Sequence, residues 1–184
     1  VDALCYALAQ FLGGVLGVLF AAAILPRFIL HPPVDCVATL PRSLGRRDLA
    51  LAFAAEVGMT FVLFFSVLIF SNSAVLAPFT GVAAGVLLML FITFEAPISG
   101  MSLNPARTLG SALVGRRYSG LWLYFVAPTL GMLSAALVYV AAAGGDSVYC
   151  AKLDHSGDAP CIFHCEIERL RRGVKPPPGT GIEH

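Results

Sequence analysis

Charged residues are absent from long stretches of this chain, and this segregation limits its possible folds more than any other feature. Apart from one glutamate, Glu56, no charge occurs in four segments: Ala3 to Leu25, Leu49 to Phe70, Ala74 to Phe94 and Gly120 to Gly145. A helix needs about 20 apolar residues to cross the hydrocarbon core of a bilayer. A helix of a soluble bundle carries a polar stripe, which these segments lack. The sequence therefore predicts an all-α integral membrane protein with four full spans.

The composition narrows the function classes. Hydrophobic residues make up 58% of the 184 residues and charged residues only 12%, about half the roughly 25% of a soluble domain. The net charge of +1 offers no basic surface for nucleic acid. The spans contain no Ser-His pair, no paired carboxylates and no His-Glu-x-x-His motif, which argues against an enzyme. We therefore expect no catalysis and no cofactor.

The spans are separated by connections of different character. Pro26 to Asp48 is rich in proline and arginine and is expected to be a long polar loop, whereas Ser71 to Ser73 is expected to be a tight turn. We expect a membrane domain over residues 1–145 and a partly flexible tail over residues 146–184. Basic residues are distributed too evenly to set the orientation.

The tail contains sulfur and imidazole side chains at high density, in a spacing that matches no standard zinc finger. The candidate ligands are Cys150, His155, Cys161, His164 and Cys165. A zinc site, a redox-sensitive thiol pair and no defined role all remain open for them.

The first and last spans share a short pattern. Tyr6 to Gly13 and Tyr124 to Gly131 both follow Y-x-x-A-x-x-L-G. Two helices rich in alanine, leucine and glycine can match by chance. If the pattern is a true repeat, it indicates a channel or transporter built from two related halves.

The segment between the third and fourth spans carries the polar chemistry. Asn104 is a preferred N-cap and Pro105 suits the first helical position, so a short helix is predicted over Pro105 to Val114. About ten residues give roughly 15 Å of helix, half a bilayer. Its N-terminus and Arg107 would bring positive charge to that depth. The alternative is a surface loop with an ordinary cap and a snorkelling arginine.

These residues resemble a known family. The stretch S-G-x-S-L-N-P-A-R-T-L-G-S-A, Ser99 to Ala112, is similar to the second signature loop of the aquaporin (major intrinsic protein) family. The pair Glu56 and Thr60 matches E-x-x-x-T of the family's fourth helix, and Trp122 to Gly131 matches a motif of its sixth. The resemblance implies an incomplete hourglass fold: helix three plus a complete second repeat with one re-entrant half-helix. The first two helices and the first N-P-A loop are expected to be absent.

The resemblance also implies roles for individual residues. The pore and selectivity positions that match the family are Asn104, Pro105, Ala106, Arg107, Met101 and Ile92. Water-specific animal members carry a histidine at the position of Ile92, so this constriction is less polar. Thr108 and the aromatic pair Tyr124-Phe125 match the water-type branch rather than glycerol facilitators, and a bacterial member is expected. Glu56 matches the glutamate that braces the signature loop.

The expected function is a passive channel for water and other small uncharged solutes. The alternatives are a channel for small neutral solutes or gases rather than water, and half of a secondary transporter. A membrane enzyme or a metal-regulated anchor is the weakest candidate. The resemblance further implies a homotetramer in the plasma (inner) membrane with a cytoplasmic tail. Six glycines are interpreted as close-packing positions: Gly13, Gly14, Gly17, Gly81, Gly85 and Gly131.

Overall fold

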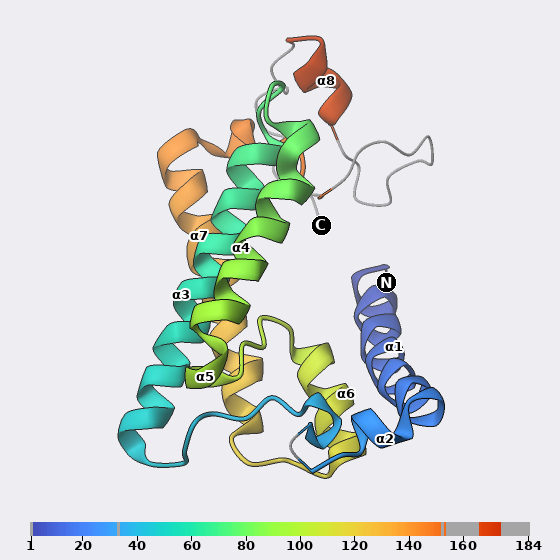
Figure 1. The fold of residues 1–184 in the computed structure, drawn as a ribbon. Helices are drawn as coiled ribbons and strands as arrows, with labels where there is room; N and C mark the ends of the chain where they lie inside the picture. The colour runs from blue at the N-terminus through green and yellow to red at the C-terminus, as the bar shows by residue number, and fades with distance from the viewer. Residues whose placement is uncertain (1, 33, 152, 154–165, 174–184) are drawn as a thin grey trace. The chain divides into compact units, whose positions relative to one another are not determined.

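The computed structural model describes residues 2–32, 34–151, 153 and 166–173, and every regular element within them is helical. Figure 1 shows the elements in chain order. The α-helices are α1 (Asp2–Ile24), α2 (Pro26–Ile29), α3 (Arg46–Ser71), α4 (Thr80–Phe94), α5 (Ala96–Ser99), α6 (Pro105–Gly115), α7 (Leu121–Ala143) and α8 (Ile167–Arg171). Three short 3₁₀ turns are η1 (Asp35–Val37), η2 (Ala77–Phe79) and η3 (Gly145–Ser147). The predicted all-α class is confirmed for the described residues.

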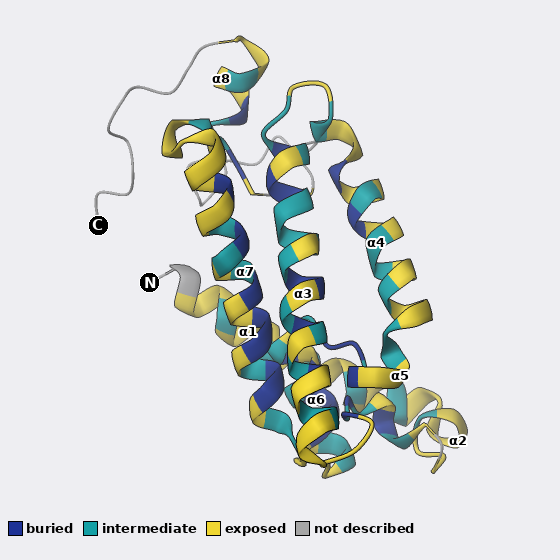
Figure 2. Cartoon of the chain, turned by 90° about the vertical axis from the view of Figure 1, so that its left-hand side faces the viewer, coloured by how far each residue is buried: buried dark blue, intermediate teal, exposed yellow. Residues whose placement is uncertain are grey.

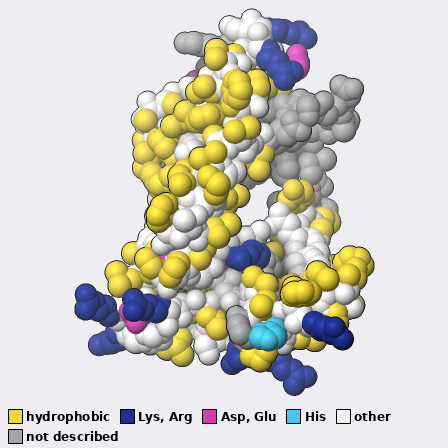
Figure 3. Space-filling view, in the orientation of Figure 1, with side chains coloured by type: hydrophobic (Ala, Val, Ile, Leu, Met, Phe, Trp, Pro, Cys, Tyr) yellow, Lys and Arg dark blue, Asp and Glu magenta, His cyan; other side chains and the backbone are white. Residues whose placement is uncertain are grey.

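Four helical segments are long and apolar enough to cross a membrane, which confirms the predicted number. They are Leu4–Ile24, Arg46–Ser71, Ala77–Phe94 and Leu121–Ala143. Large apolar side chains on them, including Leu12, Phe20 and Leu137, are more than half exposed, and hydrophobic side chains cover the visible face of the long helices (Figure 3). Such extensive exposed apolar surface suits lipid rather than water. The chain is an integral membrane protein.

The third span begins later than the sequence indicated, because residues 74–76 form a turn and η2 precedes α4. The backbone oxygen of Ser73 accepts a hydrogen bond from Ala77 N at 2.8 Å, and its Oγ accepts one from Leu76 N at 3.4 Å. Pro78 then lies in the first turn of η2, where its missing N–H costs nothing.

The chain divides into two compact units, which are described separately. The first comprises Val1–Met59 with Phe91–Leu130, and the second comprises Thr60–Leu90 with Gly131–His184. The core of the first unit contains four fully buried residues of α3 and α7: Ala52, Leu123, Tyr124 and Ala127. Buried positions on α7 appear dark blue in Figure 2. This core packs α3 against α7. From it, the hydroxyl group of Tyr124 reaches the backbone oxygen of Ser99, in the loop before α6.

Helix α1 packs against α6 within the first unit, and two glycines allow the close contact. A Cβ on Gly14 would lie 2.7 Å from Ala106 O, and a Cβ on Gly110 would lie 2.6 Å from Gly14 O. No side chain fits at these distances, so the two backbones are in direct contact. Close packing was also predicted for three glycines that meet nothing within 4 Å among the described residues: Gly13, Gly17 and Gly85. At these three positions the described part of the chain offers no close contact, so close packing stays a prediction there.

The connection from Pro26 to Asp48 is more ordered than the predicted polar loop, since it contains α2 and η1. All three η1 residues have left-handed backbones, with φ of 46° at Asp35, 56° at Cys36 and 55° at Val37. Arg117 Nε lies 2.7 Å from Asp35 Oδ2, and the side chain of Cys36 is buried. The η1 turn therefore packs against α6.

In the second unit, the end of α3 binds the start of the predicted tail. Asn72 Oδ1 accepts hydrogen bonds from Tyr149 N at 2.6 Å and Cys150 N at 2.9 Å, and Ser71 Oγ donates to Cys150 O at 2.8 Å. Cys150 is buried. The other candidate metal ligands lie outside the described residues: His155, Cys161, His164 and Cys165. Within the part of the chain that the structure describes, no three His, Cys, Asp or Glu side chains gather to hold a metal.

Candidate functional site

Helix α6 begins as the sequence predicts. Asn104 has an extended backbone, and its Oδ1 accepts a hydrogen bond from Ala106 N at 2.9 Å, while Pro105 occupies the first helical position. The helix has eleven residues, counted from Pro105, which corresponds to about 16 Å. The helix ends at Arg116, whose left-handed backbone (φ 55°) lets its N–H bond to Ala112 O. The predicted cap and helix start are confirmed.

The loop of residues 99–103, which we call the pre-helix loop, has an unusual backbone. Gly100, Met101 and Leu103 lie in the left-handed region, with φ of 82°, 51° and 56°. For the two residues with side chains this conformation costs about 1–2 kcal/mol each. A backbone of this shape provides no local backbone acceptor for the amides of Ser102 and Leu103, so these two amides depend on acceptors from elsewhere.

Glu56 of α3 supplies those acceptors. Its Oε1 accepts from Ser102 N at 2.7 Å and its Oε2 accepts from Leu103 N at 2.9 Å. The side chain is fully buried, so both bonds are shielded from competing water. One carboxylate thus binds two successive amides directly before Asn104.

Ser99 is a second anchor of the pre-helix loop. Its Oγ lies 2.7 Å from Glu56 Oε1 and 2.9 Å from Glu95 Oε2, and it accepts from Met101 N at 3.1 Å. Tyr124 of α7 donates its hydroxyl proton to the backbone oxygen of Ser99. No pattern in the sequence indicated this role of Ser99, although a hydroxyl residue at the start of a non-helical stretch is a common source of local hydrogen bonds.

Two further hydroxyl groups join the pre-helix loop to α6. Ser102 Oγ lies 2.5 Å from Thr108 Oγ1, and it also accepts from Asn104 N at 3.3 Å. Thr108 is fully buried. Its hydroxyl therefore contacts the loop, and it connects the first turns of the helix to the residues that precede the cap.

Arg107 is the exposed cation of the site. Its Nη1 donates to Met101 O at 2.5 Å, so the left-handed backbone of Met101 is what turns this carbonyl toward the guanidinium. Met101 itself has a buried side chain. Of the predicted pore residues, the structure therefore brings together Asn104, Arg107 and the backbone of Met101, while Ile92 is exposed on α4.

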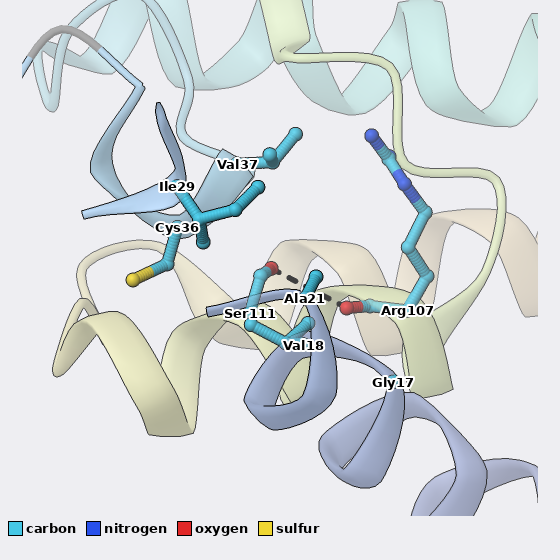
Figure 4. A pocket seen from close by; sticks show the side chains of 8 residues that line it. All are labelled: Gly17, Val18, Ala21, Ile29, Cys36, Val37, Arg107 and Ser111. Carbon is cyan, nitrogen blue, oxygen red and sulfur yellow. Dashed lines mark hydrogen bonds between the residues drawn. The ribbon is translucent and has the colours of Figure 1, made fainter. Parts of the chain in front are cut away.

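Arg107 also lines a cavity of about 170 Å³ in the first unit. Figure 4 shows its side chain extending along one side of the cavity, with Val37 and Ile29 opposite and residues of α1 beneath. The complete lining is Gly17, Val18, Ala21, Ile29, Cys36, Val37, Arg107 and Ser111. The cavity is therefore mostly apolar, with one fixed cation at its edge.

The carboxyl group of Glu95, at the junction of α4 and α5, is the polar group of the site with the poorest hydrogen bonding. Its Oε1 is buried and has no hydrogen-bond partner among the residues that the structure describes. Burial raises the pKa of Glu95 to about 7, with a smaller contribution from the nearby charge of Glu56 in the same direction. The acid therefore titrates close to neutral pH.

Comparison of the amino-acid sequence with known proteins points to one family. The family model described as Major intrinsic protein matches residues 1–139. The chain is 37% identical over 142 residues to Aquaporin NIP3-1 of Arabidopsis thaliana, covering 73% of this chain and 42% of that protein. It is 36% identical over 138 residues to Aquaporin NIP1-4 of Oryza sativa subsp. japonica, covering 73% and 46%.

A third relative is similar to the same share of this chain. The chain is 33% identical over 135 residues to Nodulin-26 of Glycine max, covering 73% of this chain and 47% of that protein. The chain thus spans less than half the length of these curated relatives.

Proposed function

Because the chain belongs to the major intrinsic protein family, we propose that it forms part of a passive transmembrane channel for water and other small uncharged solutes. The observation that carries the proposal is the placement of Arg107. Its guanidinium is held by Met101 O at 2.5 Å, at the edge of a cavity and one turn from the capped start of α6. A fixed cation at a helix N-terminus repels cations and protons without binding neutral solutes tightly.

Asn104 supports passage of a neutral solute. Its Oδ1 is occupied by Ala106 N, which leaves the Nδ2 donors to face a permeating molecule. A water or small alcohol oxygen accepts such bonds, whereas a hydrated cation cannot. Together, the Asn104 amide and the Arg107 guanidinium offer several donors, and this polarity favours solutes that have a lone pair and no positive charge.

The nature of the permeant depends on the apolar members of the site. Ile92 is exposed on α4 and offers no hydrogen bond, in contrast to the histidine that the resemblance places there in water-specific members. This residue favours a second candidate, a channel for small neutral solutes or gases rather than water. The residues Thr108 and Tyr124-Phe125 support the water-type branch.

We further propose that residues 1–145 correspond to the family fold from its third helix to its sixth, with residues 146–184 as a cytoplasmic tail. The same resemblance supports a homotetramer, a plasma-membrane location and a bacterial source. These proposals depend on the order of the spans and the half-helix along the chain.

Stopped-flow light scattering on proteoliposomes tests the channel. Vesicles that hold the protein should shrink faster than empty vesicles under an osmotic gradient of an impermeant solute. Under a gradient of glycerol or urea, the rate of re-swelling reports neutral-solute passage and separates the two candidates. Equal rates in protein-containing and empty vesicles for every solute would contradict the proposal.

Arg107→Ala tests the site itself. We expect proton and cation leak to rise while water flow persists, because the fixed charge is lost and the channel is not blocked. Arg47→Ala, which removes an exposed arginine at the start of α3, is the matched control and should leave both rates unchanged. An unaltered leak in Arg107→Ala would remove Arg107 from the selectivity mechanism.

A further inference from the structure

The hydroxyl group of Ser99 lies between two acidic side chains. Its Oγ is 2.7 Å from Glu56 Oε1 and 2.9 Å from Glu95 Oε2, and it already accepts from Met101 N. A hydroxyl has one proton to donate and two lone pairs to accept with. If both glutamates were ionised, one of the two oxygen–oxygen contacts would contain no proton and would be repulsive. The geometry therefore requires one more proton.

We propose that Glu95 holds this proton, donates it in a hydrogen bond to Ser99 Oγ, and thereby acts as a positioning residue for the loop that holds Arg107. The positioning role rests on the proposed channel function. In this arrangement Ser99 Oγ accepts from Glu95 and from Met101 N and donates to Glu56, so its full hydrogen-bonding capacity is used. The proton remains covalently bound to the Glu95 carboxyl group, and Ser99 Oγ accepts it only in a hydrogen bond.

The surroundings of the two acids favour Glu95 as the site of the proton. Both oxygens of Glu56 accept from backbone amides, Ser102 N and Leu103 N, so Glu56 is committed to accepting. Among the described residues, Glu95 has weaker support: its Oε1 is buried without a hydrogen-bond partner, and Ser99 alone donates to its carboxyl group, through the hydroxyl and to a lesser extent through the backbone N–H. A neutral carboxyl tolerates that environment far better than a carboxylate does.

The other ionisable groups around Glu95 do not offset a negative charge there. Glu56 faces it from α3 and Tyr124 from α7, and a negative charge on either would repel a carboxylate at Glu95. Among the described residues, no Lys or Arg forms an ion pair with Glu95. In agreement with this geometry, the raised pKa of about 7 keeps Glu95 protonated in mildly acidic solution.

Loss of the proton would disturb the pre-helix loop. Ser99 can then donate to only one of two carboxylates, that of Glu56 or that of Glu95. Met101 depends on the position of Ser99, because its N–H donates to Ser99 Oγ. The same residue holds Arg107 through its carbonyl oxygen at 2.5 Å. Deprotonation of Glu95 is therefore transmitted to Arg107 through Ser99 and Met101, and channel permeability should fall as the pH rises through neutrality.

Infrared spectroscopy of the protein in lipid vesicles tests the proton directly and requires no transport. We expect the carbonyl stretch of a protonated carboxylic acid at about pH 6 and its loss by about pH 8.5. Glu95→Gln should lack the band, whereas Glu168→Gln, which alters an exposed glutamate of α8, should retain it. Absence of the band at the lower pH, or its presence in Glu95→Gln, would overturn the proposal.

Stopped-flow permeability over the same pH range tests the positioning role. We expect the wild-type rate to fall roughly twofold or more as the acid ionises, because ionisation shifts the loop between two populations. Glu95→Gln, whose amide remains a neutral donor to Ser99, should keep the low-pH rate at every pH. Circular dichroism and gel filtration confirm that the variant is folded.

The outcomes separate the two proposals. A normal infrared titration with pH-independent wild-type permeability would overturn the positioning role alone. Vesicles without any permeability would overturn the proposed channel and the positioning role with it, while the infrared band would still establish the proton on Glu95.

Discussion

The two segments on either side of Asn104 are stabilised in opposite ways. The pre-helix loop has left-handed residues at three positions and takes its hydrogen bonds from side chains, mainly those of Glu56, Ser99 and Tyr124. Helix α6 forms its own backbone bonds and is positioned by direct backbone contact between Gly110 and Gly14. The loop is therefore sensitive to the loss of single polar atoms, whereas the helix is sensitive to added volume.

Glu56→Ala should have the largest effect, because it removes the shared acceptor of the loop. One buried amide, one partly buried amide and one hydroxyl lose their partner, and hydrogen bonds to a charged group contribute about 1.5–3 kcal/mol each. We expect the free energy of unfolding in detergent to fall by about 3 kcal/mol or more, with loss of permeability. Chemical denaturation and stopped-flow measurements check both.

The conservative variant sharpens this test. Glu56→Gln keeps one acceptor oxygen and the same volume, so it should lose less stability than Glu56→Ala. If the two variants were equally stable, packing of the side chain rather than hydrogen bonding would account for the role of Glu56.

Gly14→Ala and Gly13→Ala test the helix side of the comparison with two adjacent residues of α1. A Cβ at Gly14 would lie 2.7 Å from Ala106 O, whereas a Cβ at Gly13 meets nothing within 4 Å of the described chain. We expect Gly14→Ala to destabilise by about 1–3 kcal/mol through overpacking. Gly13→Ala should stabilise by about 0.5–1 kcal/mol, because alanine restricts the unfolded chain. Thermal unfolding of both variants measures the difference, and equal effects would argue against close contact of α1 with α6.

Asn104 lies at the junction of the two segments, and Asn104→Ala should have a moderate effect on stability. Loss of the bond from Ala106 N to Oδ1 should cost about 1 kcal/mol of stability, as for other N-caps. Asn104→Ser retains a capping oxygen and should recover most of this stability, but not the Nδ2 donors. A permeability that recovered fully in Asn104→Ser would contradict a role for those donors.

A separate test concerns pH. Between about pH 4.5 and 7 the folded protein keeps a proton on Glu95 that the unfolded chain releases. The folded state then binds more protons, so the free energy of unfolding falls as pH rises through this window. In Glu95→Gln the slope should be shallower by this contribution. Denaturation in detergent at a series of pH values checks it, and parallel curves for the two proteins would exclude a proton on Glu95.

Much of the architecture follows from local patterns in the sequence. Runs without charge indicated four spans, and the Asn104-Pro105 pair indicated where α6 begins, because capping and apolar length are properties of a few adjacent residues. The same reasoning placed the third span too early, since the turn at residues 74–76 depends on hydrogen bonds to Ser73 that no periodicity reveals.

Parts of the site were beyond the reach of the sequence. Glu56 was conspicuous as a lone charge, but the two amides that it binds lie 46 and 47 residues further along the chain. Ser99 stood out only as the first residue of the signature stretch, and Glu95 belonged to no motif. The packing of Gly14 against α6, and not that of Gly13, also depends on which helix lies nearby.

The sequence by itself determined that this chain is a helical membrane protein with a short capped helix and an arginine one turn inside it, because charge segregation, helix capping and span length are local. Only the tertiary structure decided that Glu56 binds the loop amides, that Met101 O binds Arg107, and that Ser99 lies between two acids. Hydrogen bonds between buried groups require approach to within about 3 Å, and residues distant in the chain reach that distance only when the helices pack.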